Sequence, residues 1–229
     1  MKTQPSKVVA IVPAAGIGSR MQADIPKQYL PLGEQCILAH TLDVLLNHDK
    51  IDQVVVALNP EDQTFPSLAQ ATHPKLTTVV GGKERADSVL AGLKIADSGS
   101  WALVHDAARP CLKPSDIDKL LASRLDNPQG AILAMPVRDT MKRANTQGKI
   151  GETVCRESLW HALTPQLFPA ELLASYLDKA LQNGVNITDE ASAMEWGGVQ
   201  PALVIGRADN IKVTHPDDLA LAELFLARR

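Results

Sequence analysis

The sequence has few cysteines, no excess of charge of either sign and no long hydrophobic run. Its three cysteines, Cys36, Cys111 and Cys155, are odd in number and widely spaced, which excludes a disulfide framework and a CxxC metal site. Lys and Arg together number 23 against 26 Asp and Glu, a net charge of −3. The overall charge therefore gives no reason to expect binding to nucleic acid or to an anionic membrane, and any anion site must be local.

Apolar runs are short throughout the chain. Those at 54–58 and 131–135 fall far below the roughly 20 residues that a membrane-spanning helix needs. The N-terminal run at 8–12 ends at Pro13 and a glycine-containing loop, so it lacks the length and the cleavage pattern of a signal peptide. We therefore expect a cytoplasmic protein without a membrane span.

What the sequence does contain is a regular alternation of β-branched runs and amphipathic stretches. With 229 residues, 45% of them apolar, the chain is expected to form one large domain over 1–229. The alternation is typical of an α/β fold with a mostly parallel central sheet flanked by helices. Strands are expected at 8–13, 53–58, 77–80, 102–106 and 131–137. Helices are expected at 37–46 and 89–96, and a Thr-x-x-acid signal at Thr214 and Asp217 starts a last one.

Residues 138–156 interrupt this alternation. Polar, β-compatible segments surround a turn-forming Asn-Thr-Gln-Gly cluster at 145–148, which predicts a β-hairpin projecting from the main sheet. Such a hairpin offers little apolar surface for packing on its own domain. We therefore expect it to be a dimerisation arm that is stabilised against another subunit.

A loop of small residues follows the first strand, Pro-Ala-Ala-Gly-Ile-Gly-Ser-Arg-Met at 13–21, and Pro-Lys-Gln follows at 26–28. Met21 stands where the GxGxxG motif needs its third glycine, and the GxxxxGK[ST] loop lacks its lysine, so both common nucleotide motifs are excluded. Small residues let backbone N–H groups approach an anion, and Arg20 and Lys27 add two cations, which suits a polyphosphate. The alternative is a tight strand-to-helix turn with two solvated basic residues.

A second cluster, Gly-Gly-Lys-Glu-Arg-Ala-Asp-Ser at 81–88, follows another predicted strand and opens a helix. Backbone N–H groups and the Ser88 hydroxyl at such a helix start can hold a phosphate or the edge of a base. An ordinary strand-to-helix turn remains the alternative explanation.

A third cluster, His-Asp-Ala-Ala-Arg-Pro at 105–110, lies at the carboxyl end of an apolar strand, where open α/β sheets bind ligands. Asp106 is therefore the candidate ligand of Mg²⁺, directly or through water, and Arg109 is close enough to neutralise phosphate. Asp209 is a lesser candidate for the metal. His105 is expected to be a structural neighbour, and no serine or cysteine has a matching His and acid for nucleophilic catalysis.

Two later positions give weaker signals. Thr188 can begin a helix as its N-cap, which is the structural alternative to a role in binding. Lys212 stands in an apolar-flanked segment that is expected to be a strand. A lysine at a strand end near a cleft usually has an anionic partner.

Taken together, these motifs resemble the 2-C-methyl-D-erythritol 4-phosphate cytidylyltransferase family. The matching segments span essentially the whole chain: 13–21, 26–29, 105–110, 164–166, 188–192 and 210–214. The resemblance implies a nucleotidyltransferase-type, Rossmann-like fold, dependence on Mg²⁺ or another hard divalent cation, a homodimer, and a step in non-mevalonate isoprenoid synthesis. The implied reaction is attack by the phosphate oxygen of methylerythritol phosphate on the α-phosphorus of CTP, which releases pyrophosphate.

The resemblance also implies roles for individual residues. Those implied for CTP are Ala14, Ala15, Gly16, Gly82, Arg85, Ser88, Asp106 and Ala107. Those implied for methylerythritol phosphate are Asp106, Arg109, Thr164, Thr188 and Lys212, together with Thr140 and Arg156 from the partner's hairpin. The implied catalytic cations are Arg20, Lys27, Arg156 and Lys212. Since a phosphate monoester is already ionised, catalysis would rest on alignment and charge stabilisation and would need no strong base.

Two other functions remain open at this point. A cytidylyltransferase for another sugar-alcohol phosphate, such as ribitol 5-phosphate, shares the lysine-bearing loop and the sheet, although the residues at 13–15 and 188–192 favour the methylerythritol enzyme. A non-catalytic nucleotide-binding regulator would keep the glycine loop, but it would have no reason to retain the four catalytic cations together.

Overall fold

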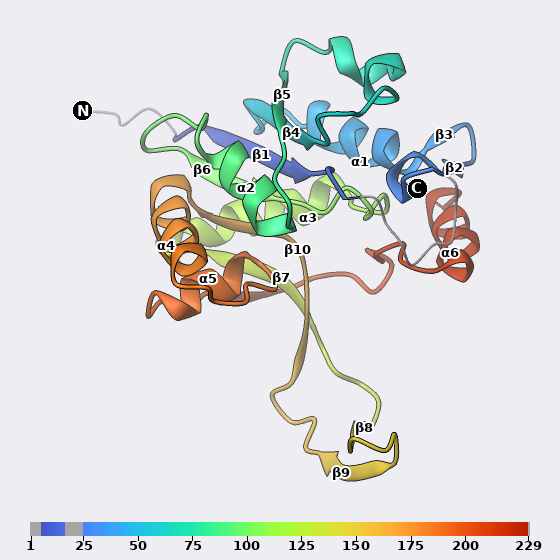
Figure 1. Cartoon of the computed structure of the whole chain (residues 1–229), viewed down its shortest axis with the longest axis vertical. Helices are drawn as coiled ribbons and strands as arrows, with labels where there is room; N and C mark the ends of the chain where they lie inside the picture. Colours follow the sequence, from blue (N-terminus) through green and yellow to red (C-terminus); the bar gives the residue numbers. More distant parts are fainter. Residues whose placement is uncertain (1–5, 17–24, 229) are drawn as a thin grey trace.

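A seven-stranded sheet forms the centre of the computed structural model, which describes residues 6–16 and 25–228 (Figure 1). The strands follow the spatial order β11-β7-β10-β6-β1-β4-β5. Their bounds are β1 Val8–Pro13, β4 Gln53–Leu58, β5 Leu76–Val80, β6 Trp101–Val104, β7 Ala131–Pro136, β10 Trp160–Pro169 and β11 Ala202–Ile205. A short separate ladder joins β2 Pro31–Leu32 and β3 Gln35–Cys36.

Most neighbouring strands of the main sheet run parallel, as predicted. β1 pairs in parallel with β4 and β6, β4 with β5, and β11 with β7. β10 is the exception, because it pairs antiparallel with both β6 and β7. Its direction follows from the chain path: β7 leads out of the sheet into the hairpin, and β10 brings the chain back beside it (Figure 1).

Helices cover both faces of the sheet. Their bounds are α1 Ile37–Leu46, α2 Arg85–Leu93, α3 Pro114–Ala122, α4 Ala170–Gln182, α5 Glu190–Trp196 and α6 Pro216–Leu226. Short 3₁₀ helices lie at η2 Lys27–Tyr29, η3 Phe65–Ser67, η4 Ala69–Thr72 and η5 Ser123–Leu125. Among the described residues, no helix has the length and apolar character needed to cross a bilayer.

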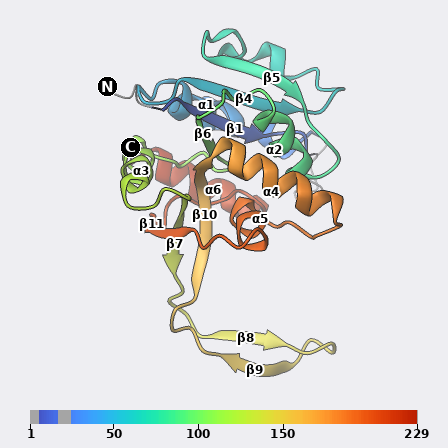
Figure 2. The same ribbon diagram turned by 90° about the vertical axis from the view of Figure 1, so that its left-hand side faces the viewer.

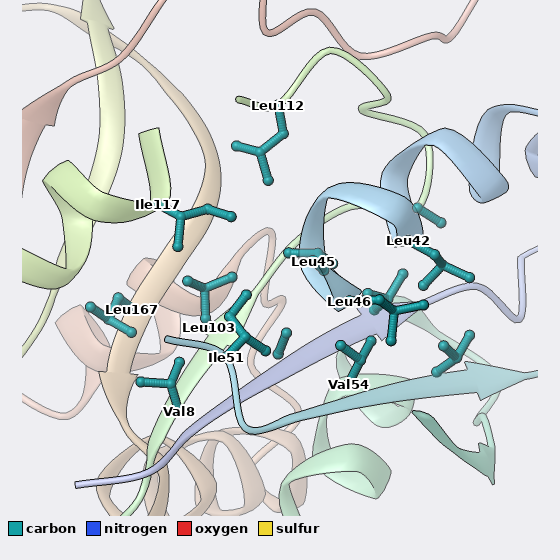
Figure 3. Close-up of a cluster of buried hydrophobic side chains, with 14 of the residues drawn as sticks. Val8, Leu42, Leu45, Leu46, Ile51, Val54, Leu103, Leu112, Ile117 and Leu167 are labelled. Atoms are coloured by element: carbon teal, nitrogen blue, oxygen red, sulfur yellow. The ribbon is translucent and has the colours of Figure 1, made fainter. Parts of the chain in front are cut away.

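The core is split into two layers by the alternation of side chains along each strand. Val8 and Val12 of β1 belong to the cluster that contains α1 and α3, which Figure 3 shows in part. Val9 and Ile11 face the opposite way and pack with α2, α4 and α5. Both faces of β1 and β4 are buried, and the two strands consist almost wholly of apolar residues. Their observed bounds are identical to the predicted ones.

Some predicted boundaries are wrong in ways that affect the site. The strand expected at 102–106 ends at Val104, so Asp106 lies on the loop beyond it. The segment around Lys212 forms no strand. It is a loop, and the Val213 N–H donates to the carbonyl of Ala108 in another loop (2.8 Å). The bounds of the remaining predicted strands agree with the observed bounds within one residue. The helix expected at 89–96 is observed as α2, which begins at Arg85 and ends at Leu93.

The last helix begins one residue later than its predicted signal. The N-cap is His215, and Asp218 rather than Asp217 is the acid that closes the start. The Asp218 carboxylate accepts from the backbone N–H groups of Thr214 and His215, both at 2.8 Å. Pro216 occupies the first turn, where a proline needs no hydrogen-bond partner for a backbone N–H.

The projecting hairpin is confirmed. β8 Met141–Ala144 and β9 Ile150–Val154 form their own antiparallel sheet, and Figures 1 and 2 show it extending away from the rest of the molecule beyond the ends of β7 and β10. Every residue of β8 and four of the five residues of β9 are exposed. We call residues 138–156 the arm. The three cysteines, all within the described residues, form no disulfide.

Candidate active site

A cavity of about 300 Å³ lies beyond the carboxyl ends of β1, β5 and β6, and we call it the first cavity. Parallel strands bring their following loops together at this edge of the sheet. The first cavity is lined by all eight residues that the resemblance implies for CTP: Ala14, Ala15, Gly16, Gly82, Arg85, Ser88, Asp106 and Ala107. Lys27 and Lys212 also line it. Arg20 lies outside the described residues.

A second cavity of about 270 Å³ adjoins the first, and the two share Arg85, Asp106 and Lys212 as a common wall. It is lined further by Arg109, Ala162, Leu163, Thr164, Gln166, Thr188 and Asp189. The structure thus brings together every residue of this chain's main body that the resemblance implies for methylerythritol phosphate.

Close packing shapes the loop at 81–88. A Cβ on Gly81 would lie 2.5 Å from the Ala15 Cβ, and a Cβ on Gly82 would collide with Asp87. The Gly82 N–H donates to Ser88 Oγ (3.1 Å), which fixes the loop against the start of α2. Gly81 therefore lets the loops after β1 and β5 approach each other at the rim of the first cavity, and Gly82 lets its loop pack against the start of α2.

Asp106 is the centre of a cluster of charges in the common wall. Its Oδ1 accepts from Arg85 Nε (3.0 Å), and its Oδ2 lies 2.9 Å from Lys212 Nζ and 3.4 Å from Arg109 Nε. Burial would raise the pKa of Asp106, but the three neighbouring cations outweigh burial and hold this pKa well below its ordinary value. The Asp106 carboxylate is therefore ionised throughout the physiological range.

Arg85 continues the cluster to a second carboxylate. Its Nη1 and Nη2 donate to the two oxygens of Glu190, at 2.6 and 3.1 Å. Burial would lower the pKa of Arg85, but the charges of Glu190 and Asp106 raise it above its usual range. The sequence did not single out Glu190, because an acid at the start of a helix has a local explanation and nothing in the sequence points to an arginine 105 positions away.

His105 and Thr164 fix the loop that carries Asp106. Thr164 Oγ1 accepts from the Asp106 backbone N–H (3.1 Å) and lies 3.0 Å from His105 Nδ1, while His105 Nε2 lies 3.1 Å from the Arg109 carbonyl. Burial lowers the pKa of His105 to about 4, so the imidazole is neutral at pH 7. Its Nε2–H then donates to Arg109 O and its Nδ1 accepts from Thr164. This arrangement agrees with the structural role expected for His105.

Thr188 and Lys212 differ from their sequence interpretations in local structure. The N-cap of α5 is Asp189, whose carboxylate accepts from the Ser192 N–H (2.9 Å), and Thr188 precedes the cap and lines the second cavity. Lys212 lies in a loop, yet its ion pair with Asp106 confirms the anionic partner that was expected.

Three other predicted residues lie away from the two cavities. Thr140 and Arg156 belong to the arm and line neither cavity as the described residues define them; Arg156 Nη1 donates to the Arg138 carbonyl. Asp209, the lesser metal candidate, pairs with Arg207 and also lines neither cavity. The geometry therefore leaves Asp106 as the carboxylate of the common wall.

Comparisons with known proteins identify the family of the chain. The family model of 2-C-methyl-D-erythritol 4-phosphate cytidylyltransferase matches residues 8–228. A protein of that name from Shewanella oneidensis is 72% identical over 223 residues, which cover 97% of this chain and 90% of the relative. A Francisella tularensis protein of the same name superposes with a TM-score of 0.83 at 34% identity, covering 96% of this chain and 100% of the other.

A further solved structure, of a 4-diphosphocytidyl-2C-methyl-D-erythritol synthase, gives a TM-score of 0.84 at 38% identity and covers 97% of this chain and 100% of the other. The resemblance seen in the motifs thus extends over the sequence and the fold alike. The chain belongs to the 2-C-methyl-D-erythritol 4-phosphate cytidylyltransferase family.

Proposed function

We propose that this protein transfers CMP from CTP to 2-C-methyl-D-erythritol 4-phosphate, forming 4-diphosphocytidyl-2-C-methyl-D-erythritol and releasing pyrophosphate, in non-mevalonate isoprenoid precursor synthesis. The observation that carries the proposal is the pair of adjoining cavities with the charged wall of Arg85, Asp106 and Lys212 between them. CTP occupies the first cavity and the acceptor phosphate the second. The proposal includes a cytoplasmic location, since CTP is a metabolite of that compartment.

The reaction needs positive charge more than it needs a base. An oxygen of the acceptor phosphate attacks the α-phosphorus of CTP, and pyrophosphate leaves from the opposite side. Arg109 and Lys212 line the second cavity and suit the acceptor phosphate, while Lys27 lines the first and suits the charge that develops on the triphosphate. Arg20 would add a second cation to the triphosphate, as the family resemblance implies.

Asp106 fits a role in holding Mg²⁺ or another hard divalent cation. It is the carboxylate that lines both cavities, and the described residues contain no group of three or more His, Cys, Asp or Glu side chains arranged for a metal. One carboxylate together with substrate phosphates is a common way for a protein to bind Mg²⁺. The ion would neutralise charge on the triphosphate when bound.

The arm supports a homodimer with shared sites. Its strands are exposed, and Arg156 and Thr140 lie outside the cavities of their own chain. In a C₂ dimer each arm would reach the second cavity of the neighbouring chain, where Thr140 and Arg156 add a hydroxyl and a cation for the acceptor phosphate.

A product assay tests the proposed function. The purified protein is incubated with CTP, Mg²⁺ and methylerythritol phosphate, or with ribitol 5-phosphate in a parallel reaction, and the nucleotide products are identified by mass spectrometry. We expect 4-diphosphocytidyl-2-C-methyl-D-erythritol with release of pyrophosphate. Preferential formation of cytidine diphosphate ribitol would favour the related enzyme, and no turnover with either acceptor would favour a non-catalytic nucleotide-binding protein.

A further inference from the structure

Glu190 is a buried carboxylate without a part in the proposed reaction. Only 1% of its surface is exposed, at the first residue of α5. It lines neither cavity as the described residues define them. Burying a carboxylate is unfavourable unless it is paired, and Glu190 is paired through both oxygens with the guanidinium of Arg85. Glu190 therefore does not contact a ligand of either cavity directly, and its hydrogen bonds reach the cavities through Arg85.

Arg85 divides its donors between two carboxylates. Nη1 and Nη2 donate to Glu190, and Nε donates to Asp106, so three of its five N–H bonds have partners among the described residues. The bidentate contact fixes the plane of the guanidinium, which a single hydrogen bond would leave able to rotate. In this orientation Arg85 lines both cavities at once.

We propose that Glu190 is a positioning residue that holds Arg85 in the common wall, so that the guanidinium meets ligands of both cavities and contacts Asp106 through one nitrogen only. This inference rests on the proposed function. Without the charge of Glu190, the nearest anion for the Arg85 fork is Asp106. The fork would turn toward it and bind it through two nitrogens, which would draw Arg85 away from its ligands and occupy the Asp106 carboxylate.

The charge of Glu190 alone predicts the opposite result. Arg85, Arg109 and Lys212 face Asp106 and Glu190, which gives three positive and two negative charges in the cluster. Neutralising Glu190 would make the wall more positive, and a pure charge effect would tighten the binding of anionic substrates. A purely structural effect would lower the fraction of active protein, which reduces the apparent kcat but leaves both KM values unchanged.

Steady-state kinetics of Glu190→Gln separate these roles, because glutamine keeps the shape and one acceptor oxygen. We expect kcat/KM for CTP to fall by about tenfold or more, with a raised KM for at least one substrate and a folded protein by circular dichroism. Glu195→Gln, an exposed glutamate on the same helix, is the matched control and should behave as the wild type.

A double-mutant cycle tests whether Glu190 acts through Arg85. Arg85→Gln alone should lose activity, and Arg85→Gln with Glu190→Gln should lose no more than that, since the residue that Glu190 positions is gone. Independent losses that multiply in the double variant would overturn the proposal. So would wild-type or tighter KM values, with unchanged kcat, in folded Glu190→Gln.

Two further measurements cover the remaining outcomes. If Glu190→Gln does not fold, Glu190→Asp takes its place: it keeps the charge but shortens the reach, so a loss in kcat/KM with a raised KM supports positioning, and wild-type kinetics contradict it. If the wild type makes no product, the proposed function fails by itself. The same cycle is then measured as CTP affinity by calorimetry, where non-additive losses support the inference and additive ones refute it.

Discussion

Asp106 is the residue whose charge connects the two cavities. Three cations surround its carboxylate, two of them within 3.0 Å, and it lines the first and the second cavity alike. A ligand that carries phosphate competes with Asp106 for these cations, and a metal ion competes with the cations for Asp106. This arrangement is therefore a set of ion pairs that substrates are expected to exchange.

Asp106→Asn tests the metal role at the scale of one side chain. Asparagine keeps the size of the side chain but removes the charge that attracts Mg²⁺. We expect calorimetry to show that Mg²⁺ tightens CTP binding to the wild type and no longer does so, or does so at least about tenfold less, in the variant. An equal gain from Mg²⁺ in both proteins would remove Asp106 from the metal site.

His105 gives a prediction on stability and pH. Its folded-state pKa is lowered to about 4 by burial, below the ordinary histidine value, so between these two values the unfolded chain binds a proton that the folded chain does not. Stability therefore falls as the pH decreases from about 6.5 toward 4, and one such histidine contributes a slope of about 1 kcal/mol per pH unit near pH 5.5.

Urea unfolding of metal-free protein between pH 5 and 7 measures this slope. His105→Asn should show a slope lower by about that amount, whatever its absolute stability. Equal slopes for His105→Asn and the wild type would contradict the lowered pKa of His105, because the imidazole would then bind its proton equally in the folded and unfolded chains.

At the scale of secondary-structure elements, α2 is the helix that carries the wall of the first cavity. This helix lies close to β1 at Gly92. A Cβ added to Gly92 would be only 2.7 Å from Cγ2 of Ile11 and 3.6 Å from Cγ1 of Val55. These neighbours belong to a buried cluster and have little freedom to move. The position of Arg85 at the start of α2 thus depends on a glycine near its end.

Gly92→Ala should destabilise the protein, although alanine favours helix formation by about 1 kcal/mol over glycine. Overpacking of a well-packed core typically costs about 1–3 kcal/mol, which outweighs this gain. We expect a lower urea midpoint with an unchanged m-value, and a raised KM for CTP because α2 must move away from β1. A midpoint equal to or above that of the wild type would contradict the close packing.

Strands buried on both faces were predictable because their sequences are continuous apolar runs, as in β1 and β4. β10 was not, since Thr164, Pro165 and Gln166 interrupt it, and proline is unfavourable in a central strand. The ladder to β7 accommodates this segment through a shift in register between Ala162 and Gln166.

The candidate site was predictable where its residues follow strands, because parallel topology alone gathers the loops that carry Arg85, Asp106 and the small residues at 14–16. The partner of Arg85 was not, since Glu190 arrives from a distant helix and meets Arg85 only through tertiary packing. The N-cap at Asp189 differs from the Thr188 interpretation for a similar reason. Several residues near a helix start can act as cap, and the local geometry selects among them.

At the scale of the whole molecule, the arm is the feature that the isolated chain leaves unexplained. Its strands contact little of the body, and Met141 and Ile150 expose apolar surface on it. In the proposed dimer, the second chain would bury this surface and receive Arg156 at its acceptor site. The proposed catalytic role of the arm therefore requires the proposed dimer.

Mixing two inactive variants tests the shared site. Chains with Arg156→Ala and chains with Lys27→Ala are unfolded together and refolded, so that mixed dimers form. One of the two sites in each mixed dimer then contains both intact residues, and we expect activity up to roughly half of that of a wild-type dimer. No recovery, despite mixed dimers proven by mass spectrometry, would mean that Arg156 acts within its own chain or not at all.

The central claim is cytidylyl transfer to methylerythritol phosphate, and its most direct test is a competition between this acceptor and ribitol 5-phosphate for one pool of CTP. The assay is run with the wild type and with Lys27→Ala, which alters the first cavity. Lys94→Ala, which alters an exposed lysine, is the control. We expect wild type and control to form the methylerythritol product in large excess, and folded Lys27→Ala to do so with kcat lower by at least about 100-fold, the effect of losing one preorganised cation. Equal use of both acceptors would contradict selective transfer to methylerythritol phosphate, and Lys27→Ala with unchanged kcat would contradict catalysis at the first cavity.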